Sequence, residues 1–355
     1  MSFPTKERDV IEWLAEYGLF LAKTATLVIA IGIILALVAH GRRRGRGDSE
    51  ARLKVTELDE RFQRRSRQLS LAAVPKARRR QLAKQLRRSV KLDQKQGASQ
   101  EAERVWVLDF DGDLKASGTP ALAELVSLLL ETIRDGDEVV LRLQSGGGLV
   151  HSYGLAAAQL DRLRDAGARL TVCVDKVAAS GGYMMACCAN RLIAAPFAVI
   201  GSIGVVAQIP NVHRLLKRHD VDVELLTAGR YKRTLTVLGE NSEEGRTKFL
   251  EDLESTHDLF KRYVSARRPS LDIETVATGE IWYGSEALEA GLIDAVGTSD
   301  AYLLEKQRDR ARVLKVSLTS RSGLMGKLGK GVESGLETGI DRVLQRVDDL
   351  RWQRR

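Results

Sequence analysis

The chain contains little cysteine: Cys173, Cys187 and Cys188 are the three cysteines among 355 residues. All three lie in or beside apolar segments, where a free cysteine behaves as a small hydrophobic residue. Their spacing offers neither a set of metal ligands nor a disulfide framework. The sequence therefore does not describe a zinc module or a disulfide-stabilised domain, and we expect no metal or other cofactor.

Histidine is also scarce, with five residues and none between His151 and His213. Within that interval, Ser180 follows a β-branched apolar segment and precedes two glycines. A serine at a strand-to-helix turn presents its hydroxyl as a nucleophile. The usual histidine base is missing nearby, but an isolated lysine, Lys232, follows in the sequence. A Ser-Lys pair needs only these two side chains, so we expect Ser180 as nucleophile and Lys232 as general base.

Glycine is concentrated where such a site would need it. An oxyanion requires two preorganised N–H donors, and Gly181, next after the nucleophile, is the first candidate. The loop 145–148 reads Ser-Gly-Gly-Gly and ends the preceding strand, so Gly148 is the second. In the segment 201–204, Ser202 could orient the ammonium group of Lys232 by hydrogen bonding. Together these residues predict an acyl-transfer site.

Each feature also has a simpler explanation when it is taken alone. A Ser-Gly-Gly turn is common, and Lys232 between two arginines would ordinarily be a solvated surface charge. The glycine loop could be a plain turn or a phosphate cradle, although it lacks the Lys-Ser/Thr pair of a P-loop. Ser202 could be only a small residue in a tight turn. The prediction depends on all four features occurring together.

The positive charge is concentrated in one region. Between Arg42 and Lys95 there are 19 Lys and Arg against 6 Asp and Glu, whereas the whole chain carries +9. This block contains one aromatic residue, Phe62, and follows an apolar segment directly. Nucleic-acid binding by this block remains an alternative, but a patch facing acidic lipid head groups fits the pattern better.

The apolar segment from Gly18 to Ala39 has Lys23 as its one charged residue. Its length suits a single transmembrane helix. A cleaved signal peptide would have a basic N-terminal region, but residues 1–17 carry more acidic than basic side chains. We therefore expect an uncleaved anchor. The arginines that follow this segment favour a cytoplasmic location for its carboxyl end.

From Arg104 onward, apolar segments of strand length alternate with helical patterns, which predicts an α/β fold with a parallel sheet. A later amphipathic helix contains Phe260 and Val264 on its apolar face, and we interpret its His257 as a packing or surface residue. The expected strands are 105–110, 139–143, 170–174, 193–200 and 223–226. The expected parts are an N-terminal segment 1–17, a transmembrane anchor 18–40, a basic helical or disordered stalk 41–103, a catalytic domain 104–305 and an amphipathic tail 306–355.

Several long segments resemble peptidase family S49, which includes the signal peptide peptidase SppA and the SohB proteins. They are DKVAASGGYMMA, APFAVIGSIGVVAQIP, TAGRYKRTLTVLGENSEEGR and RPSLDIETVATGEIWYGSEALEAGLID. The likeness covers roughly residues 104–300 and the layout of anchor and stalk before them.

The resemblance implies a ClpP/crotonase-like spiral of β-β-α units and a membrane-anchored serine endopeptidase. It places the nucleophile at Ser180, the base at Lys232, the lysine-orienting serine at Ser202 and the oxyanion donors at Gly181 and Gly148. It also implies a homo-oligomer in which serine and lysine meet across a subunit interface. The implied substrates are remnant signal peptides and other short or unfolded apolar peptides.

Two points depart from the family pattern. The oxyanion loop has Gly146 where the family usually has proline, which makes the loop less preorganised. The family's periplasmic active site at the bacterial inner membrane also conflicts with the arginines that follow the anchor. We expect the periplasmic face from the resemblance, with the cytoplasmic face as the alternative. A catalytically inactive membrane scaffold and a crotonase-type acyl-CoA enzyme are the competing functional interpretations.

Overall fold

The computed structural model describes residues 24, 26, 51–97 and 103–319. The chain divides into two compact units, and the unit Lys54–Ser317 contains the predicted site residues. Apart from Thr24 and Thr26, the predicted anchor lies outside the described residues, as do the segment 1–17 and the tail beyond Thr319. In the described part of the chain, no helix combines the length and apolar character that crossing a membrane requires.

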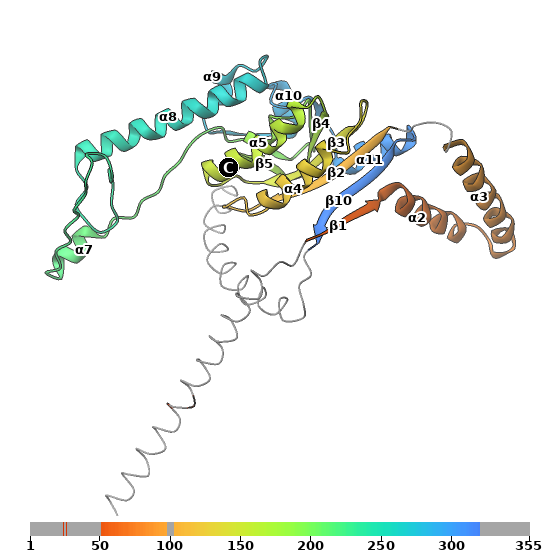
Figure 1. The fold of residues 1–355 in the computed structure, drawn as a ribbon, viewed down its shortest axis with the longest axis horizontal. Helices are drawn as coiled ribbons and strands as arrows, with labels where there is room; N and C mark the ends of the chain where they lie inside the picture. The colour runs from red at the N-terminus through yellow and green to blue at the C-terminus, as the bar shows by residue number, and fades with distance from the viewer. Residues whose placement is uncertain (1–23, 25, 27–50, 98–102, 320–355) are drawn as a thin grey trace, which may run out of the picture. The chain divides into compact units, whose positions relative to one another are not determined.

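The described unit is built on a ten-stranded sheet (Figure 1). Its main path runs in the order β1-β10-β2-β3-β4-β6-β9, and a branch leaves β3 through β5 and β7 to β8. The strands are β1 (Arg52–Glu57), β2 (Arg104–Gly112), β3 (Glu138–Ser145), β4 (Arg169–Val174), β5 (Val177–Ala179), β6 (Arg191–Ala194), β7 (Val199–Gly201), β8 (Ile281–Tyr283), β9 (Ala295–Val296) and β10 (Arg312–Thr319). The neighbours β10, β2, β3, β4, β6 and β9 pair in parallel, as predicted from the β-α alternation.

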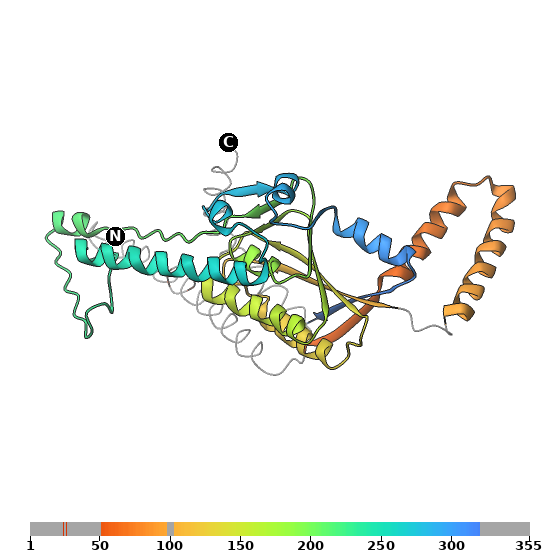
Figure 2. The same cartoon turned by 90° about the horizontal axis from the view of Figure 1, so that it is seen from above.

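Helices cover both faces of this sheet, as expected for strands that are apolar on both sides. The helices are α2 (Leu58–Ala72), α3 (Lys76–Gly97), α4 (Thr119–Leu130), α5 (Val150–Asp165), α6 (Gly181–Ala186), α7 (His213–Arg218), α8 (Glu243–Arg267), α9 (Ile273–Val276), α10 (Gly284–Glu289) and α11 (Ser299–Arg308). Residues 204–242, which we call the arm, extend away from the sheet between β7 and α8 (Figures 1 and 2).

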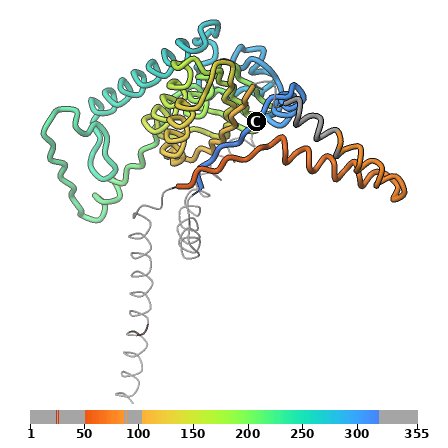
Figure 3. Tube along the Cα trace, turned by 45° about the vertical axis from the view of Figure 1, so that its right-hand side comes forward, coloured from red at the N-terminus to blue at the C-terminus, as the bar shows by residue number. Residues whose placement is uncertain are grey.

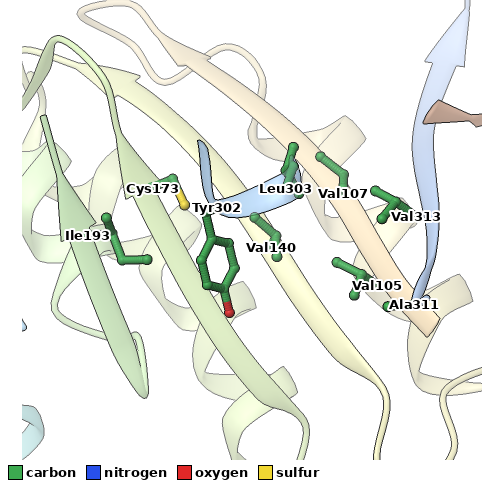
Figure 4. Close-up of a cluster of buried hydrophobic side chains, with 9 residues drawn as sticks. All are labelled: Val105, Val107, Val140, Cys173, Ile193, Tyr302, Leu303, Ala311 and Val313. Atoms are coloured by element: carbon green, nitrogen blue, oxygen red, sulfur yellow. The ribbon is translucent and has the colours of Figure 1, made fainter. Parts of the chain in front are cut away.

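One part of the core lies between α11 and the sheet (Figure 4). Tyr302 and Leu303 of α11 pack against the sheet. Their neighbours there include Val105 and Val107, which are alternate residues of β2 and are fully buried. Alternate positions of a strand point to the same face, so the residues between them face the opposite layer. The predicted burial of the three cysteines is confirmed, and all three are free thiols.

Four local expectations differ from the structure. The expected strand 193–200 is two strands, β6 and β7, separated by a turn at 195–198 in which Phe197 is 85% exposed. The predicted strand 223–226 is wrong: these residues lie in the arm, where Leu226 is 89% exposed and no strand lies beside them to pair with. The predicted stalk contains β1 as well as the helices α2 and α3 (Figure 3). Within the predicted tail, β10 joins the sheet beside β2, so the sheet extends beyond residue 305.

Candidate active site

Three strand ends bring the predicted residues together. Because β3, β5 and β7 pair in parallel, their carboxyl ends meet at one edge of the sheet. In α/β proteins, ligands bind at this edge. The glycine loop follows β3, Ser180 follows β5, and Ser202 follows β7. The structure therefore places three of the four predicted features side by side, although they lie far apart in the sequence.

Ser180 occupies a strained turn between β5 and α6. Its φ of 52° and ψ of −119° lie outside the regions that most residues prefer. Its N–H donates to the carbonyl of Gly201 at 2.8 Å, and its carbonyl accepts from Met184 N–H at 3.0 Å. The cost of such a conformation is of order 1–3 kcal/mol, and strain of this kind clusters at functional sites. The half-buried Ser180 hydroxyl is thus held at the end of the sheet by fixed backbone contacts.

The glycines around Ser180 allow close backbone packing. A methyl group added at Gly181 would lie 2.4 Å from Cγ of Tyr153, and one at Gly182 would lie 2.4 Å from the carbonyl oxygen of Ser145. Gly147 has a φ of 90°, and a methyl group there would lie 2.8 Å from both the nitrogen of Gly181 and Cβ of Ser180. The glycine loop therefore lies directly against the nucleophile turn.

A chain of hydrogen bonds fixes this loop. The N–H of Gly147 donates to the Ser145 hydroxyl at 3.1 Å, which lies 2.6 Å from the Tyr153 hydroxyl. The Tyr153 hydroxyl donates in turn to the carbonyl of Asp113 at 2.7 Å. Burial raises the pKa of Tyr153, so its hydroxyl keeps the proton that it donates. Sequence reasoning missed Gly147, Ser145 and Tyr153, because nothing in their spacing indicates this chain.

The two predicted oxyanion donors remain available. The N–H of Gly147 is used within the loop, whereas the N–H of Gly148 has no hydrogen-bond partner among the described residues. Gly148 itself packs against Leu114, whose carbonyl oxygen lies 2.1 Å from the position of an added methyl group. Gly181 is the first residue of α6, so its N–H has no partner within the helix. Both N–H groups can therefore donate to a substrate.

Ser202 lies in a second strained turn. Gly201 has a φ of 93° and Ser202 a φ of 50°. The N–H of Ser202 donates to the carbonyl of Glu280 at 2.7 Å. Trp282 lies so close to Gly201 that an added methyl group would be 2.8 Å from its Cδ1 atom, so glycine is required there. Ser202 follows β7, which pairs with the strand β5 that precedes Ser180.

Lys232 lies elsewhere in the same chain. It is exposed, and its loop in the arm contacts the first turns of α8. Arg230 pairs with Glu244, and a methyl group on Gly245 would lie 2.2 Å from the carbonyl oxygen of Thr234. Twelve residues further along α8, the ring of His257 bonds to the carbonyl of Ile203. At 1.5 Å per helical residue, the positions on α8 that contact the Lys232 loop and the Ser202 turn lie about 18 Å apart along the helix.

Comparisons with known proteins identify the family of the chain. Residues 12–160 match peptidase family S49 N-terminal, and residues 162–313 match peptidase family S49. A probable protease SohB from Haemophilus influenzae is 47% identical over 339 residues, which cover 93% of this chain and 96% of that protein. A probable protease SohB from Buchnera aphidicola subsp. Schlechtendalia chinensis is 45% identical over 83% of this chain and its own full length.

A more distant relative is the chloroplastic serine protease SPPA of Arabidopsis thaliana, 29% identical over 67% of this chain and 36% of that protein. The α/β fold holds the strained Ser180 turn where the parallel strands β3, β5 and β7 end. The chain belongs to peptidase family S49. Its similarity to the probable SohB proteases extends over most of its length, so the resemblance found in the sequence is confirmed.

Proposed function

We propose that the protein is a serine endopeptidase in which Ser180 of one protomer works with Lys232 of a neighbouring protomer. The observation that carries this proposal is the geometry around Ser180. A strained serine is held beside two N–H groups, of Gly181 and Gly148, that have no partner among the described residues. The Lys232 loop and the Ser202 turn contact α8 at positions about 18 Å apart along the helix, which favours a base supplied by another chain.

The chemistry follows from these positions. Neutral Lys232 accepts the Ser180 hydroxyl proton as the oxygen attacks the peptide carbonyl. The N–H groups of Gly181 and Gly148 bind the oxyanion that forms. Lys232 then gives the proton to the leaving amine, which departs and leaves an ester on Ser180. Water, deprotonated by Lys232, hydrolyses that ester and restores the enzyme.

Lys232 must be neutral to act, so it needs a drier environment than its exposed position in one protomer. Burial lowers the pKa of a lysine because it disfavours the charged form. An interface between protomers would supply that burial, and Ser202 would hydrogen-bond to the amine. The arm carries exposed apolar side chains suited to such a contact, among them Val206, Leu225 and Leu226.

The substrates that fit this proposal are short or unfolded apolar peptides such as remnant signal peptides. The ClpP/crotonase-like spiral, the membrane anchor at 18–40 and the homo-oligomer belong to the same proposal. The basic stretch also fits a membrane location: residues 58–97 hold thirteen Lys and Arg against three Asp and Glu. This charge would attract the α2–α3 segment to acidic lipid head groups.

Cleavage of a quenched signal-peptide substrate by the full-length protein in detergent tests the proposal. We expect Ser180→Ala and Lys232→Arg to lower kcat by about a thousandfold or more while assembly is kept. Arginine retains the charge but cannot give up its proton, so Lys232→Arg tests the base alone. Ser180→Ala should also abolish labelling by a fluorophosphonate. Full activity in either variant would remove that residue from the mechanism.

A further inference from the structure

The helix α8 joins two parts of the candidate site. Its first turn holds the Lys232 loop through the contacts at Glu244 and Gly245. Its last turns are anchored to the rest of the unit, with Phe260 and Val264 buried. There Asp161 accepts hydrogen bonds from Tyr263 at 2.8 Å and from Arg267 at 2.9 Å. The helix is therefore fixed at its carboxyl end and carries the Lys232 loop at its amino end (Figure 2).

His257 lies on the face of α8 that packs against the rest of the unit. The positions 257, 260 and 264 follow the i, i+3, i+7 spacing of one helix face, so His257 continues the stripe formed by Phe260 and Val264. Its side chain is half-buried, and Nε2 lies 3.2 Å from the carbonyl oxygen of Ile203. A carbonyl can only accept, so the ring donates this hydrogen bond.

Ile203 directly follows Ser202, and its side chain is fully buried. Three hydrogen bonds from three different elements hold the turn that contains them. The carbonyl of Gly201 accepts from Ser180 N–H, the N–H of Ser202 donates to Glu280, and the carbonyl of Ile203 accepts from His257. The positive φ of Ser202 is costly, whereas Gly201 adopts its own without strain, so the surrounding contacts must hold Ser202 in this turn.

We propose that His257 is a positioning residue, which holds the Ser202 turn in the conformation that directs Ser202 to the catalytic lysine. This role rests on the proposed function, since it requires Ser202 to act on Lys232 of the neighbouring protomer. His257 does not touch substrate. It acts through the Ile203 carbonyl and ties the Ser202 turn to the helix that carries the protomer's own Lys232 loop.

A packing role would depend on the volume of the ring, whereas a positioning role depends on its N–H. The substitutions His257→Leu and His257→Gln separate the two. Leucine fills the space without a donor, and glutamine supplies an amide N–H on a side chain of similar length. Glu254→Ala, which removes an exposed side chain three residues earlier on α8, is the matched control.

We expect His257→Leu to lower kcat about tenfold with little change in KM, because a small misplacement of a catalytic group costs rate more than binding. His257→Gln should recover most of that loss, and Glu254→Ala should match the parent. Melting temperature and oligomer mass, measured on each full-length variant, identify any variant that has not folded or assembled.

Hydrogen exchange at the Ser202 amide provides a readout that does not require activity. His257→Leu should speed this exchange, and His257→Gln should restore its protection. Equal kcat and equal exchange in the leucine variant and the parent would overturn the proposal, as would a glutamine variant no better than leucine. If the parent protein cleaves no peptide, the proposed function fails, and the exchange result alone then decides whether His257 holds the turn.

Discussion

At the residue scale, the candidate site depends on glycines in the loop that lies against Ser180. Gly146 and Gly147 are neighbours in one loop, but their surroundings differ. No atom lies within 4 Å of a methyl group added at Gly146, whereas one at Gly147 would meet the Ser180 turn at 2.8 Å. Gly147 also has a φ of 90°, which L residues rarely adopt. The two glycines therefore form a natural pair for substitution.

Gly147→Ala is expected to lower kcat strongly, because the added methyl group displaces the Gly181 N–H from the oxyanion position. Losing one such donor costs on the order of 10²–10³ in kcat. Gly146→Ala should keep nearly full activity, and Gly146→Pro tests whether a stiffer loop raises it. Steady-state kinetics on the three variants measure both effects, and equal kcat for the two alanine variants would contradict this account of the loop.

Tyr153→Phe tests the hydrogen-bond chain behind the loop. The change removes the acceptor of the buried Ser145 hydroxyl proton, while the Asp113 carbonyl keeps the Ala116 N–H as a donor. An unsatisfied buried polar group costs about 1–3 kcal/mol, so the free energy of unfolding should fall by that amount. Urea titration of the variant beside its parent measures the change. An unchanged midpoint would show that the chain does not stabilise the fold.

Residue identities in the site could be predicted where a local pattern carries the chemistry. Ser180 and Gly181 follow from one turn, and Ser202 follows from another. The contact between Gly147 and Ser180 could not be predicted, since it depends on the pairing of β3 with β5. The position of Lys232 is also outside the reach of a local pattern, because it is set by the path of the arm.

At the element scale, α8 depends on the anchor at its carboxyl end. Burial acts to raise the pKa of Asp161, but hydrogen bonds from Arg267 and Tyr263 outweigh it and hold that pKa below its ordinary value. Asp161 is thus a charged acceptor for two side chains of α8. The hydroxyl of Tyr263 also lies 3.4 Å from the sulfur of Cys188, so α8 contacts the residues that follow α6 as well.

Asp161→Asn should loosen α8 and lower the free energy of unfolding by on the order of 2 kcal/mol, because the Arg267 charge loses its partner. Asp252→Asn is the control, since the carboxylate of the Lys248–Asp252 pair is exposed. Exposed pairs contribute about 0–1 kcal/mol. Chemical denaturation measures the free energy of unfolding of each variant, and hydrogen exchange measures the protection of α8. Equal destabilisation by the two changes would contradict the claim that Asp161 holds the carboxyl end of α8.

Elements with strong periodicity could be predicted from the sequence, and the strands β2, β3 and β4 and the helix α8 are confirmed. The three-residue strand β5 could not be predicted, because it is too short to show a period. The strand β1 could not, because it lies in a charged segment with no buried apolar run. An apolar stretch misled the prediction at 223–226, where the structure provides no neighbouring strand. In each case the outcome is decided by a partner element, which local sequence does not show.

At the scale of the whole molecule, several carboxyl groups link stability to pH. For Asp109, Asp137 and Asp161, burial acts to raise the pKa, but arginine partners outweigh it, so each pKa lies below the ordinary value of 3.8. A carboxyl group with a lowered pKa in the folded state stabilises that state while ionised. Its contribution is therefore complete above about pH 5 and is lost as the pH falls below 4.

We expect the free energy of unfolding to be nearly constant between about pH 5 and 7 and to fall steeply below pH 4. Asp137→Asn should make the decrease in unfolding free energy below pH 4 less steep, because the neutral amide does not titrate. Urea titrations at a series of pH values measure both curves. An acid limb of the same steepness in the variant would show that Asp137 does not contribute.

The central claim concerns the assembled protein: Ser180 and Lys232 belong to different protomers of one active site. Coexpression of full-length Ser180→Ala and Lys232→Ala chains tests it directly, because each chain alone lacks one catalytic group. If the claim is right, random mixing restores about a quarter of the parental sites, since an interface then joins an intact Ser180 to an intact Lys232. Mixed assemblies of parental size that stay as inactive as either variant alone would contradict it.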